Sequence, residues 1–375
     1  MAADAGGGVV TVRILQGDCV DVLKGLPDES VHCCVTSPPY WGLRDYGVAG
    51  QLGLESTPAE YVEKMVAVFR EVKRVLRDDG TLWLNLGDSY AGSWGAQGRQ
   101  GETGEMAGRS VTAARQKSHL SAAQIAAHHH RLSNTGSIPS GSGLKPKDLV
   151  GIPWRIAFAL QAAGWYLRQD IIWSKPNPMP ESVRDRCTKA HEYIFLLSKN
   201  ERYYFDQDAI LEPVAAASVA RLSQPTLGQQ VGSYRVPGKT NSPLKAVSRS
   251  GNKERKPASA RGVPVDTDGK SAGAVAGSVP WEGTQRNKRS VWTVTTQPFK
   301  EAHFATFPPA LIEPCILAGC PEGGTVLDPF GGAGTTGLVA DRHKRNAILI
   351  ELNPEYAAMA EKRIRGDAPL FAEVV

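Results

Sequence analysis

The chain has 375 residues, of which 41% are hydrophobic and 22% are charged, and its formal net charge at pH 7 is +5. This composition is ordinary for a soluble globular protein, and the length suffices for one large domain or two. No apolar stretch is long enough to span a bilayer and the N-terminus lacks a signal sequence, so we expect a cytoplasmic protein with no membrane partner. The six cysteines lack the spacing of a zinc site, which predicts free thiols and no metal site.

Segments with the character of strands and helices alternate along the chain. We expect strands over residues 11–15, 31–36, 81–86, 168–173, 192–197, 325–328 and 346–350, and helices over 58–77, 150–163, 308–319, 335–343 and 354–364. This alternation favours an α/β fold with a doubly wound, mostly parallel sheet that helices cover on both faces. Active sites of such sheets lie at the carboxyl ends of strands, so the residues that follow each strand are the first candidates for a site.

A proline corner follows the second predicted strand. Pro38 and Pro39 forbid a helix and end the strand in a rigid, extended turn. The carbonyls of Ser37 and Pro38 and the Ser37 hydroxyl then form a group of hydrogen-bond acceptors beside the Tyr40 ring. Acceptors that hold both hydrogens of an amine would localise its lone pair for attack, and the ring would stack on a base extruded from its duplex. The simpler interpretation of the segment is a proline turn, with Trp41 either a pocket wall or a packing residue.

A glycine turn follows the strand predicted over 325–328. Gly332 to Gly337 fits the pattern G-x-G-x-x-G, and Glu351 lies 19 residues past the first glycine, where an acid that binds ribose is expected. Read alone, this fingerprint suggests a nicotinamide cofactor. It establishes only that the backbone can approach a nucleoside closely and that a carboxylate is available for its hydroxyls.

Together, these two motifs resemble those of the β class of amino-group DNA methyltransferases, which use S-adenosyl-L-methionine. Residues 36–40 look like the catalytic motif of that family, and residues 328–336 look like its cofactor loop. Further segments match in family order, and all of them together cover most of residues 10–90, 150–206 and 300–362. The catalytic motif precedes the cofactor motif, as in the β class. The resemblance therefore implies a single Rossmann-like catalytic domain over residues 1–375, in circularly permuted order.

The resemblance also implies a reaction and roles for individual residues. The enzyme would be a site-specific DNA methyltransferase that moves a methyl group from S-adenosyl-L-methionine to the exocyclic amine of a flipped base. Ser37 and the Pro38 carbonyl would accept the hydrogens of the amine within the corner that Pro39 completes, and Tyr40 would stack on the base. The cofactor residues would be Asp18 at the adenine, Glu351 at the ribose, His303 and Phe307 at the methionine end, and Asp328, Phe330, Gly332, Gly334, Thr335 and Thr336 around the loop.

The target base is a choice between cytosine N4 and adenine N6. Serine as the first motif residue, preceded by Val-Thr, resembles the family members that methylate cytosine N4, whereas Asp or Asn is more usual for adenine. We favour cytosine, although a neutral serine can accept one N–H from either amine. Two alternatives belong to other classes: a protein-glutamine methyltransferase, in which the cofactor motif would come first, and a non-catalytic DNA-binding protein, which would leave the paired motifs without a task.

Positive charge is concentrated in two inserts. Residues 91–150 carry a net charge of +4 and residues 221–290 a net charge of +9, which leaves −8 for the rest of the chain. Both segments are rich in Gly, Ser, Pro and Ala and lack strong hydrophobic periodicity, so we expect long loops. They could be solvated linkers, but basic segments beside a base-modifying site suit double-stranded DNA. We therefore expect phosphate contacts from both inserts and target recognition from residues 206–290.

Three further points stay open in the sequence. His128, His129 and His130 lie in a stretch rich in Ala and Ser without other ligand candidates nearby, so we expect an exposed loop there instead of a metal site. A homodimer and a cognate restriction nuclease are compatible with the family that the chain resembles, but no sequence motif specifies either of them.

Overall fold

The structure is a computed structural model that describes residues 10–43, 47–91, 142–222, 247–248, 279–280, 285–297, 306–367 and 372–374. The chain divides into two compact units, one formed by residues 1–209 and 289–375 and the other by residues 210–288. Much of both basic inserts, including His128, His129 and His130, lies outside the described residues.

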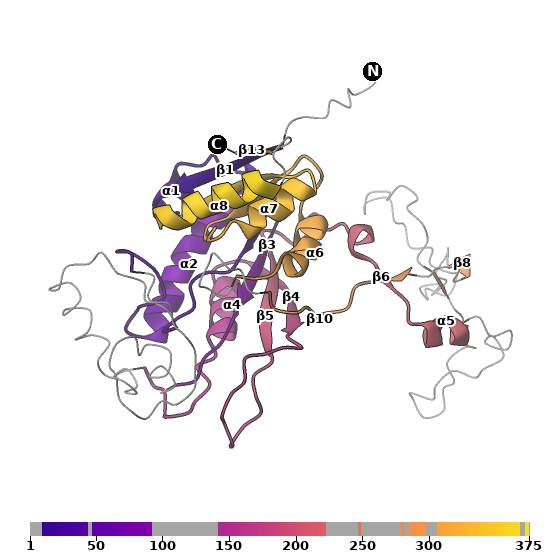
Figure 1. The fold of residues 1–375 in the computed structure, drawn as a ribbon, viewed down its shortest axis with the longest axis horizontal. Coiled ribbons are helices and arrows are strands. Elements are labelled where there is room, and N and C mark those ends of the chain that lie inside the picture. Colours follow the sequence, from indigo (N-terminus) through magenta and orange to yellow (C-terminus); the bar gives the residue numbers. More distant parts are fainter. Residues whose placement is uncertain are drawn as a thin grey trace, which may run out of the picture. The chain divides into compact units, whose positions relative to one another are not determined.

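A nine-stranded sheet forms the centre of the first unit (Figure 1). Its strands are β1 (Val10–Gln16), β2 (Val31–Thr36), β3 (Leu76–Leu86), β4 (Tyr166–Ser174), β5 (His191–Ser198), β10 (Val291–Thr293), β11 (Thr325–Asp328), β12 (Asn346–Glu351) and β13 (Ala372–Val374). They lie in the order β10-β4-β5-β3-β2-β11-β12-β1-β13. Among the described strands of this sheet, only β5 runs antiparallel to its neighbours, which are β3 and β4. The predicted mostly parallel sheet is confirmed.

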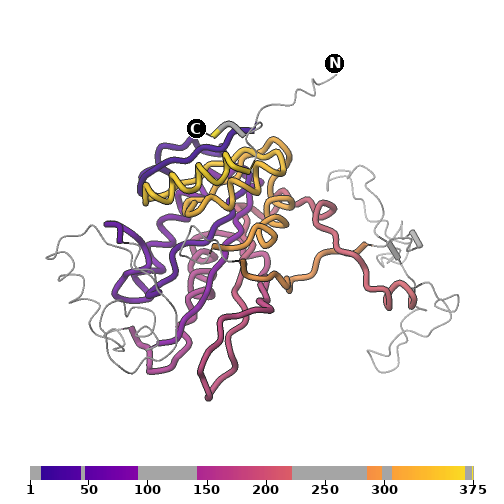
Figure 2. The backbone as a smooth tube through the Cα atoms, viewed as in Figure 1, coloured from indigo at the N-terminus to yellow at the C-terminus, as the bar shows by residue number. Residues whose placement is uncertain are grey.

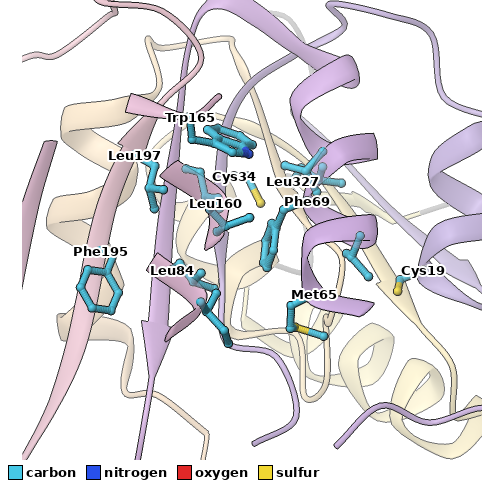
Figure 3. Packing of buried hydrophobic residues seen from close by; sticks show 14 of the residues in the cluster. Cys19, Cys34, Met65, Phe69, Leu84, Leu160, Trp165, Phe195, Leu197 and Leu327 are labelled. Atoms are coloured by element: carbon cyan, nitrogen blue, oxygen red, sulfur yellow. The ribbon is translucent and has the colours of Figure 1, made fainter. Parts of the chain in front are cut away.

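Helices cover both faces of this sheet. They are α1 (Cys19–Lys24), α2 (Pro58–Val75), α4 (Ile152–Ala162), α6 (Pro309–Gly319), α7 (Thr335–Arg342) and α8 (Pro354–Asp367). A short 3-10 helix, η2 (Asp208–Ile210), lies where the chain passes from the first unit to the second. Cys34 on β2 belongs to the same core cluster as Phe69 of α2 (Figure 3). The neighbouring Cys33 faces α6 instead, since a Cβ built on Gly319 would lie 2.8 Å from the Cys33 sulfur. Successive residues of a strand point to opposite faces, so α2 and α6 lie on opposite sides of the sheet and the doubly wound fold is confirmed.

Local sequence explains where α2 begins and ends. Pro58 occupies the first turn, and the Thr57 side chain caps the helix by accepting a hydrogen bond from the Glu60 N–H at 3.2 Å. The helix buries a continuous apolar face against the sheet, including Met65 and Phe69 (Figure 3). It ends at Val75, two residues before the predicted end. β3 starts there, five residues earlier than predicted, because Leu76 is already extended and pairs with β2.

The other predicted strands and helices agree with the observed ones within three residues at each end. The sequence did not predict the short elements α1, β10 and β13, which are too brief to show a hydrophobic period. Figure 2 shows how early and late segments of the chain come together: β1, near the N-terminus, lies beside α8 and pairs with β12 and β13. None of the helices in the described part of the chain combines the length and the apolar character needed to cross a bilayer.

The second unit is described only in short elements. They are β6 (Glu212–Pro213), α5 (Ala216–Leu222), β7 (Val247–Ser248), β8 (Val279–Pro280) and β9 (Gln285–Arg286). β6 pairs with β9 and β7 with β8, both in antiparallel fashion. Arg286 Nε donates to Glu212 Oε1 at 2.9 Å, which joins the two ends of the unit. The unit falls within the insert predicted over residues 206–290, whose role in target recognition stays a prediction.

Candidate active site

The two predicted motifs meet at one edge of the sheet. β2 and β11 are parallel neighbours, with Cys33 opposite Val326 and Cys34 opposite Leu327. Ser37, which follows β2, and Phe330, which follows β11, therefore emerge at the same rim, at the strand switch where open α/β sheets bind ligands. Both residues line one cavity of about 330 Å³, a volume at the lower end of the usual range for ligand pockets.

The cavity wall comes from four turns at the strand ends and from residues that pack around them. The lining residues are Gly17, Asp18, Cys19, Ser37, Pro38, Pro39, Tyr40, Leu43, Val48, Gly50, Gln51, Leu52, Glu192, Thr306, Phe307, Pro329, Phe330, Gly331, Gly332, Ala333, Thr335, Ile350, Glu351, Leu352, Asn353 and Tyr356. This set contains all four residues predicted to be catalytic, Ser37, Pro38, Pro39 and Tyr40. It also contains six of the residues predicted to bind the cofactor: Asp18, Phe307, Phe330, Gly332, Thr335 and Glu351.

Backbone hydrogen bonds hold the Glu351 carboxylate next to the glycine turn. Its Oε2 accepts a hydrogen bond from the Gly332 N–H at 2.8 Å, and its Oε1 accepts one from the Asn353 N–H at 2.8 Å. Burial raises the pKa of Glu351, and hydrogen bonds from the backbone of Asn353, Gly332 and Leu352 oppose that rise. Each carboxylate oxygen keeps a further lone pair, so Glu351 can also accept hydrogen bonds from the hydroxyls of a ribose.

Asp18 sits at the turn between β1 and α1 and serves as the N-cap of that helix. Its Oδ1 accepts from the Val20 N–H at 2.9 Å and from the Asp21 N–H at 3.2 Å. No described residue donates to the other carboxylate oxygen, and the side chain lines the cavity. An acceptor therefore remains available for a ligand amine.

Three residues predicted to bind the cofactor support the loop from beneath and do not line the cavity: Asp328, Gly334 and Thr336. Asp328 is 1% exposed. Its Oδ1 accepts from Thr36 Oγ1 at 2.6 Å and from the Phe330 N–H at 3.1 Å, and its Oδ2 accepts from Thr336 Oγ1 at 2.6 Å. Burial raises the pKa of Asp328 to about 6 in spite of these hydrogen bonds. Asp328 thus joins the end of β2 to the turn after β11 and to the first turn of α7.

Gly334 caps the N-terminus of α7 in a left-handed conformation, with φ of +75°. A Cβ at this position would lie 2.8 Å from the Cβ of Ala360 on α8. The glycine is therefore required for the close packing of the turn against α8. His303 lies outside the described residues, so its predicted place at the methionine end of the cofactor has no structural description.

Not every hydrogen-bond acceptor of the proline corner is available to a ligand in the cavity. The Pro39 carbonyl accepts from Tyr61 Oη at 2.6 Å and is occupied within the fold. No hydrogen bond from a described residue reaches the Pro38 carbonyl, which is thus available with the Ser37 hydroxyl. Trp41 packs in the core, where it is 3% exposed and donates to the Glu55 carbonyl at 2.9 Å, so it is not a wall of the pocket.

Sequence reasoning missed the residues that hold Tyr40. Tyr40 Oη donates to Glu192 Oε2 at 2.9 Å and lies 3.2 Å from Asn85 Oδ1. Gly87 lies directly against the ring, because a Cβ there would be 2.5 Å from Tyr40 Cε2. These residues come from the end of β3 and the beginning of β5, which share one rim because β5 is antiparallel. Only the antiparallel direction of β5, which no local sequence pattern shows, brings Glu192 to this rim.

Lys175, which follows β4, forms an ion pair with Glu192 at the edge of the sheet where the cavity lies. Its ammonium group pairs with Glu192 Oε1 and lies 4.2 Å from the centre of the Trp173 ring. Asn177 exchanges hydrogen bonds with the backbone of Thr296 at 3.1 and 3.3 Å. In this structure, Lys175 orders the site and Asn177 orders the segment after β10.

Replacing Gly87 with alanine should displace the Tyr40 ring and slow the reaction expected at this site by about a hundredfold, since a shift of about 1 Å in a positioned group has that effect. The hydroxyl of Tyr40 is held by hydrogen bonds, so the ring cannot move away without breaking them. A single-turnover assay measures the rate. Gly366→Ala is the matched control, because no described atom beyond its chain neighbours and the backbone of its own helix lies within 4 Å of the added Cβ. A Gly87→Ala enzyme as fast as the control would contradict this packing argument.

A doubly wound sheet with a glycine turn and a Ser-Pro-Pro-Tyr turn opening into one cavity defines the class of Rossmann-like methyltransferases. Comparison with known proteins shows which family within this class the chain belongs to. A profile of N6/N4 methyltransferases, described as DNA methylase, matches residues 31–362. The chain belongs to this DNA methylase family.

Its relatives include the Type II methyltransferases M.Cfr9I of Citrobacter freundii and M.SmaI of Serratia marcescens. M.Cfr9I is 41% identical over 94% of this chain and 88% of its own length, and M.SmaI is 40% identical over 94% and 90%. Among solved structures, the fold is similar to PvuII DNA methyltransferase (cytosine-N4-specific), with a TM-score of 0.52, 16% identity and 99% coverage of both chains. A candidate DNA modification methylase from Thermus thermophilus, solved with S-adenosyl-L-methionine, gives 0.51 at 21% identity and covers 97% of this chain and 99% of its own.

The protein is therefore a Type II DNA methyltransferase. It belongs to the group of enzymes that methylate an exocyclic amine, N4 or N6, and such enzymes are found in restriction-modification systems. Its substrate is DNA and its cofactor is S-adenosyl-L-methionine, as the sequence predicted. A protein-glutamine methyltransferase and a non-catalytic DNA-binding protein are both excluded by this family membership.

Proposed function

We propose that this enzyme methylates the N4 amine of cytosine in DNA. The observation that carries the proposal is the neutral Ser37 at the first position of the catalytic corner, with its hydroxyl at the cavity beside the free Pro38 carbonyl. These two oxygens can accept the two hydrogens of one exocyclic amine. PvuII methyltransferase, which shares the fold, is cytosine-N4-specific, and this agrees with the proposal.

The residues of the cavity divide into two sets with separate tasks. Ser37 and the Pro38 carbonyl hold the amine with its lone pair directed away from the ring plane, and Tyr40 stacks on the flipped base. Pro39 makes the corner rigid. S-adenosyl-L-methionine, when bound, supplies an electrophilic methyl group on a positively charged sulfur.

The second set would hold that cofactor. Glu351 accepts hydrogen bonds from the ribose and Asp18 from the adenine amine, because each has an acceptor at the cavity. Phe330 and Phe307 supply apolar surface, and Gly332 and Thr335 shape the turn. His303 is assigned to the methionine end by resemblance alone. Asp328, Gly334 and Thr336 act on the cofactor only through the loop that they support.

The remaining candidate is adenine N6. Its amine carries the same two hydrogens, so the corner alone discriminates poorly between the bases. Mass spectrometry of nucleosides from DNA that the purified protein has methylated decides the question, and N4-methylcytosine is the expected product. N6-methyladenine would overturn the base assignment and leave the reaction class unchanged, whereas the absence of any methylated base would contradict the function itself.

The two basic inserts, residues 91–150 and 206–290, supply phosphate contacts to the duplex, and the second one recognises the target sequence. Replacing Lys253, Arg255 and Lys256 with serine should flatten the dependence of log affinity on log salt by up to about 3 units, since each phosphate contact contributes about 0.9. Fluorescence anisotropy with duplex DNA at several salt concentrations measures this slope, and an unchanged slope would leave these cations without a phosphate role.

A homodimer and a cognate restriction nuclease belong to the same proposal. Analytical ultracentrifugation of the pure protein tests the dimer, which a single monomeric species would contradict. Nuclease protection of methylated DNA tests the partner, and it requires the recognition sequence to be found first.

A further inference from the structure

The Tyr40 hydroxyl is a junction between the catalytic serine and a carboxylate. Ser37 Oγ donates to Tyr40 Oη at 3.3 Å, and Tyr40 Oη donates to Glu192 Oε2 at 2.9 Å. Asn85 Oδ1 is a second acceptor for Tyr40 at 3.2 Å, but the phenol has a single hydrogen and the charged acceptor is the nearer. The hydrogen bonds therefore run in one direction, from Ser37 through Tyr40 to Glu192.

The carboxylate at the end of this chain is held in place. Glu192 Oε1 pairs with the Lys175 ammonium group, and the two side chains are 16% and 19% exposed. Asn85 Nδ2 approaches Glu192 Oε2 at 3.4 Å. Burial raises the pKa of Tyr40 well above its ordinary value, and the negative charge of Glu192 is the second cause of this rise. The phenol therefore keeps the hydrogen that it donates. Glu192 also lines the cavity that Ser37 and Tyr40 line.

The direction of the chain decides what Ser37 offers to a base. A serine hydroxyl has one hydrogen and two lone pairs. Because its hydrogen is donated to Tyr40, both lone pairs remain for the hydrogens of an amine. If Tyr40 donated to Ser37 instead, one lone pair would be consumed and the serine hydrogen would turn toward the cavity, where it would oppose the hydrogens of the amine.

We propose that Glu192 is a positioning residue for methyl transfer, which fixes Ser37 as an acceptor through Tyr40 and receives the proton that the target nitrogen gives up. This inference rests on the proposed function, because it assumes that the amine binds at Ser37. It holds for cytosine N4 and for adenine N6 alike.

The proton balance is complete within these residues. As the bond between nitrogen and methyl carbon forms, the bond between methyl carbon and sulfur breaks and its electron pair stays on sulfur. The nitrogen is left with a positive charge and one hydrogen in excess. That proton moves to Ser37 Oγ, the Ser37 proton moves to Tyr40 Oη, and the Tyr40 proton moves to the Glu192 carboxylate, which returns it to solvent.

The test compares three substitutions in single-turnover methylation of a DNA substrate that the wild-type enzyme modifies. Glu192→Gln keeps the shape and offers an N–H to Tyr40, which reverses the chain, so the rate should fall by about ten- to a hundredfold. Glu192→Asp keeps the charge and should retain more of the rate than Glu192→Gln. The dissociation constants for S-adenosyl-L-methionine and DNA should stay within about twofold of wild type, because neither ligand is held by Glu192 in this proposal.

A double-mutant cycle separates this role from a structural one. Tyr40→Phe removes the hydroxyl and keeps the ring, and adding Glu192→Gln to it should lower the rate by less than about twofold more, since the chain is already broken. Glu71→Gln is the matched control, because Glu71 is a partly buried partner of Arg74 at 2.9 Å and does not line the cavity. Its rate should equal that of wild type.

Several results would overturn the proposal while leaving the proposed function intact. They are a Glu192→Gln enzyme at the wild-type rate, effects of Tyr40→Phe and Glu192→Gln that multiply, or losses explained by weaker ligand binding. If Glu192→Gln does not fold, Tyr40→Phe decides, and a wild-type rate for that variant would also overturn it. Failure of the proposed function looks different, since the wild-type protein itself would then transfer no methyl group to DNA.

Discussion

Ser37→Ala should lower the single-turnover rate of methyl transfer by about a hundred- to a thousandfold, the usual effect of removing one positioned hydrogen-bonding group at a reacting atom. The alanine removes the acceptor for one hydrogen of the target amine and the first link of the chain to Tyr40 and Glu192. The amine lone pair then remains delocalised in the ring of the base. The corner itself should persist, because Pro38 and Pro39 define its backbone.

Cofactor binding should survive this substitution. Glu351, which is assigned to S-adenosyl-L-methionine, comes from the end of β12 instead of the corner after β2, and its carboxylate is fixed by its own hydrogen bonds. Isothermal titration calorimetry should therefore give a cofactor affinity close to that of wild type. Ser56→Ala serves as the control, since Ser56 is exposed and does not line the cavity. A Ser37→Ala enzyme that methylates at the control rate would remove the serine from the mechanism.

The convergence of the two motifs could be predicted from the sequence because it depends on simple rules. Parallel strands joined by helices bring their carboxyl ends to one edge, and the two turns with Pro and Gly mark which strand ends matter. The pairing of Cys34 with Leu327 then places Ser37 and Phe330 at one cavity. Fold class and the main lining residues follow from patterns of this kind.

Side-chain direction could not be predicted in the same way. Asp328 is the last residue of its strand, where a ligand-binding acid would stand, yet its carboxylate turns into the core and accepts from two threonine hydroxyls. Glu192 stands in an ordinary apolar strand segment, and only the antiparallel direction of β5 brings it to the cavity. Both residues depend on contacts between segments far apart in the sequence, which no local period or motif encodes.

Asp328→Ala should lower the free energy of unfolding by about 3–5 kcal/mol, because a buried polar group left without its partner costs about 1–3 kcal/mol and three donors lose their acceptor. The substitution leaves the hydroxyls of Thr36 and Thr336 and the N–H of Phe330 without their acceptor in a buried site. It also frees the residue that directly precedes Ser37, so methyl transfer should fall with stability. Urea unfolding followed by circular dichroism measures the change.

Asp328→Asn is the informative counterpart, because an amide can replace most of the hydrogen bonds without the charge. Its oxygen can accept from Thr36 and Phe330, and its N–H can donate to Thr336 while that hydroxyl donates to the Val35 carbonyl, which lies 3.5 Å away. We therefore expect Asp328→Asn to unfold at a higher urea concentration than Asp328→Ala at every pH. Equal midpoints for the two variants would contradict the hydrogen-bonded cluster.

The difference in folding stability between wild type and Asp328→Asn should depend on pH, because burial raises the pKa of Asp328. The pKa of Asp328 is raised to about 6 in the folded protein from its ordinary value of 3.8, so the folded state holds the proton more tightly than the unfolded state. Between these two values the stability of wild type relative to Asp328→Asn should fall as the pH rises, by about 3 kcal/mol in all. The difference should be constant above about pH 7 and below about pH 3. A difference independent of pH across this interval would mean that Asp328 is charged in the folded protein without cost, because its three hydrogen bonds fully compensate its burial.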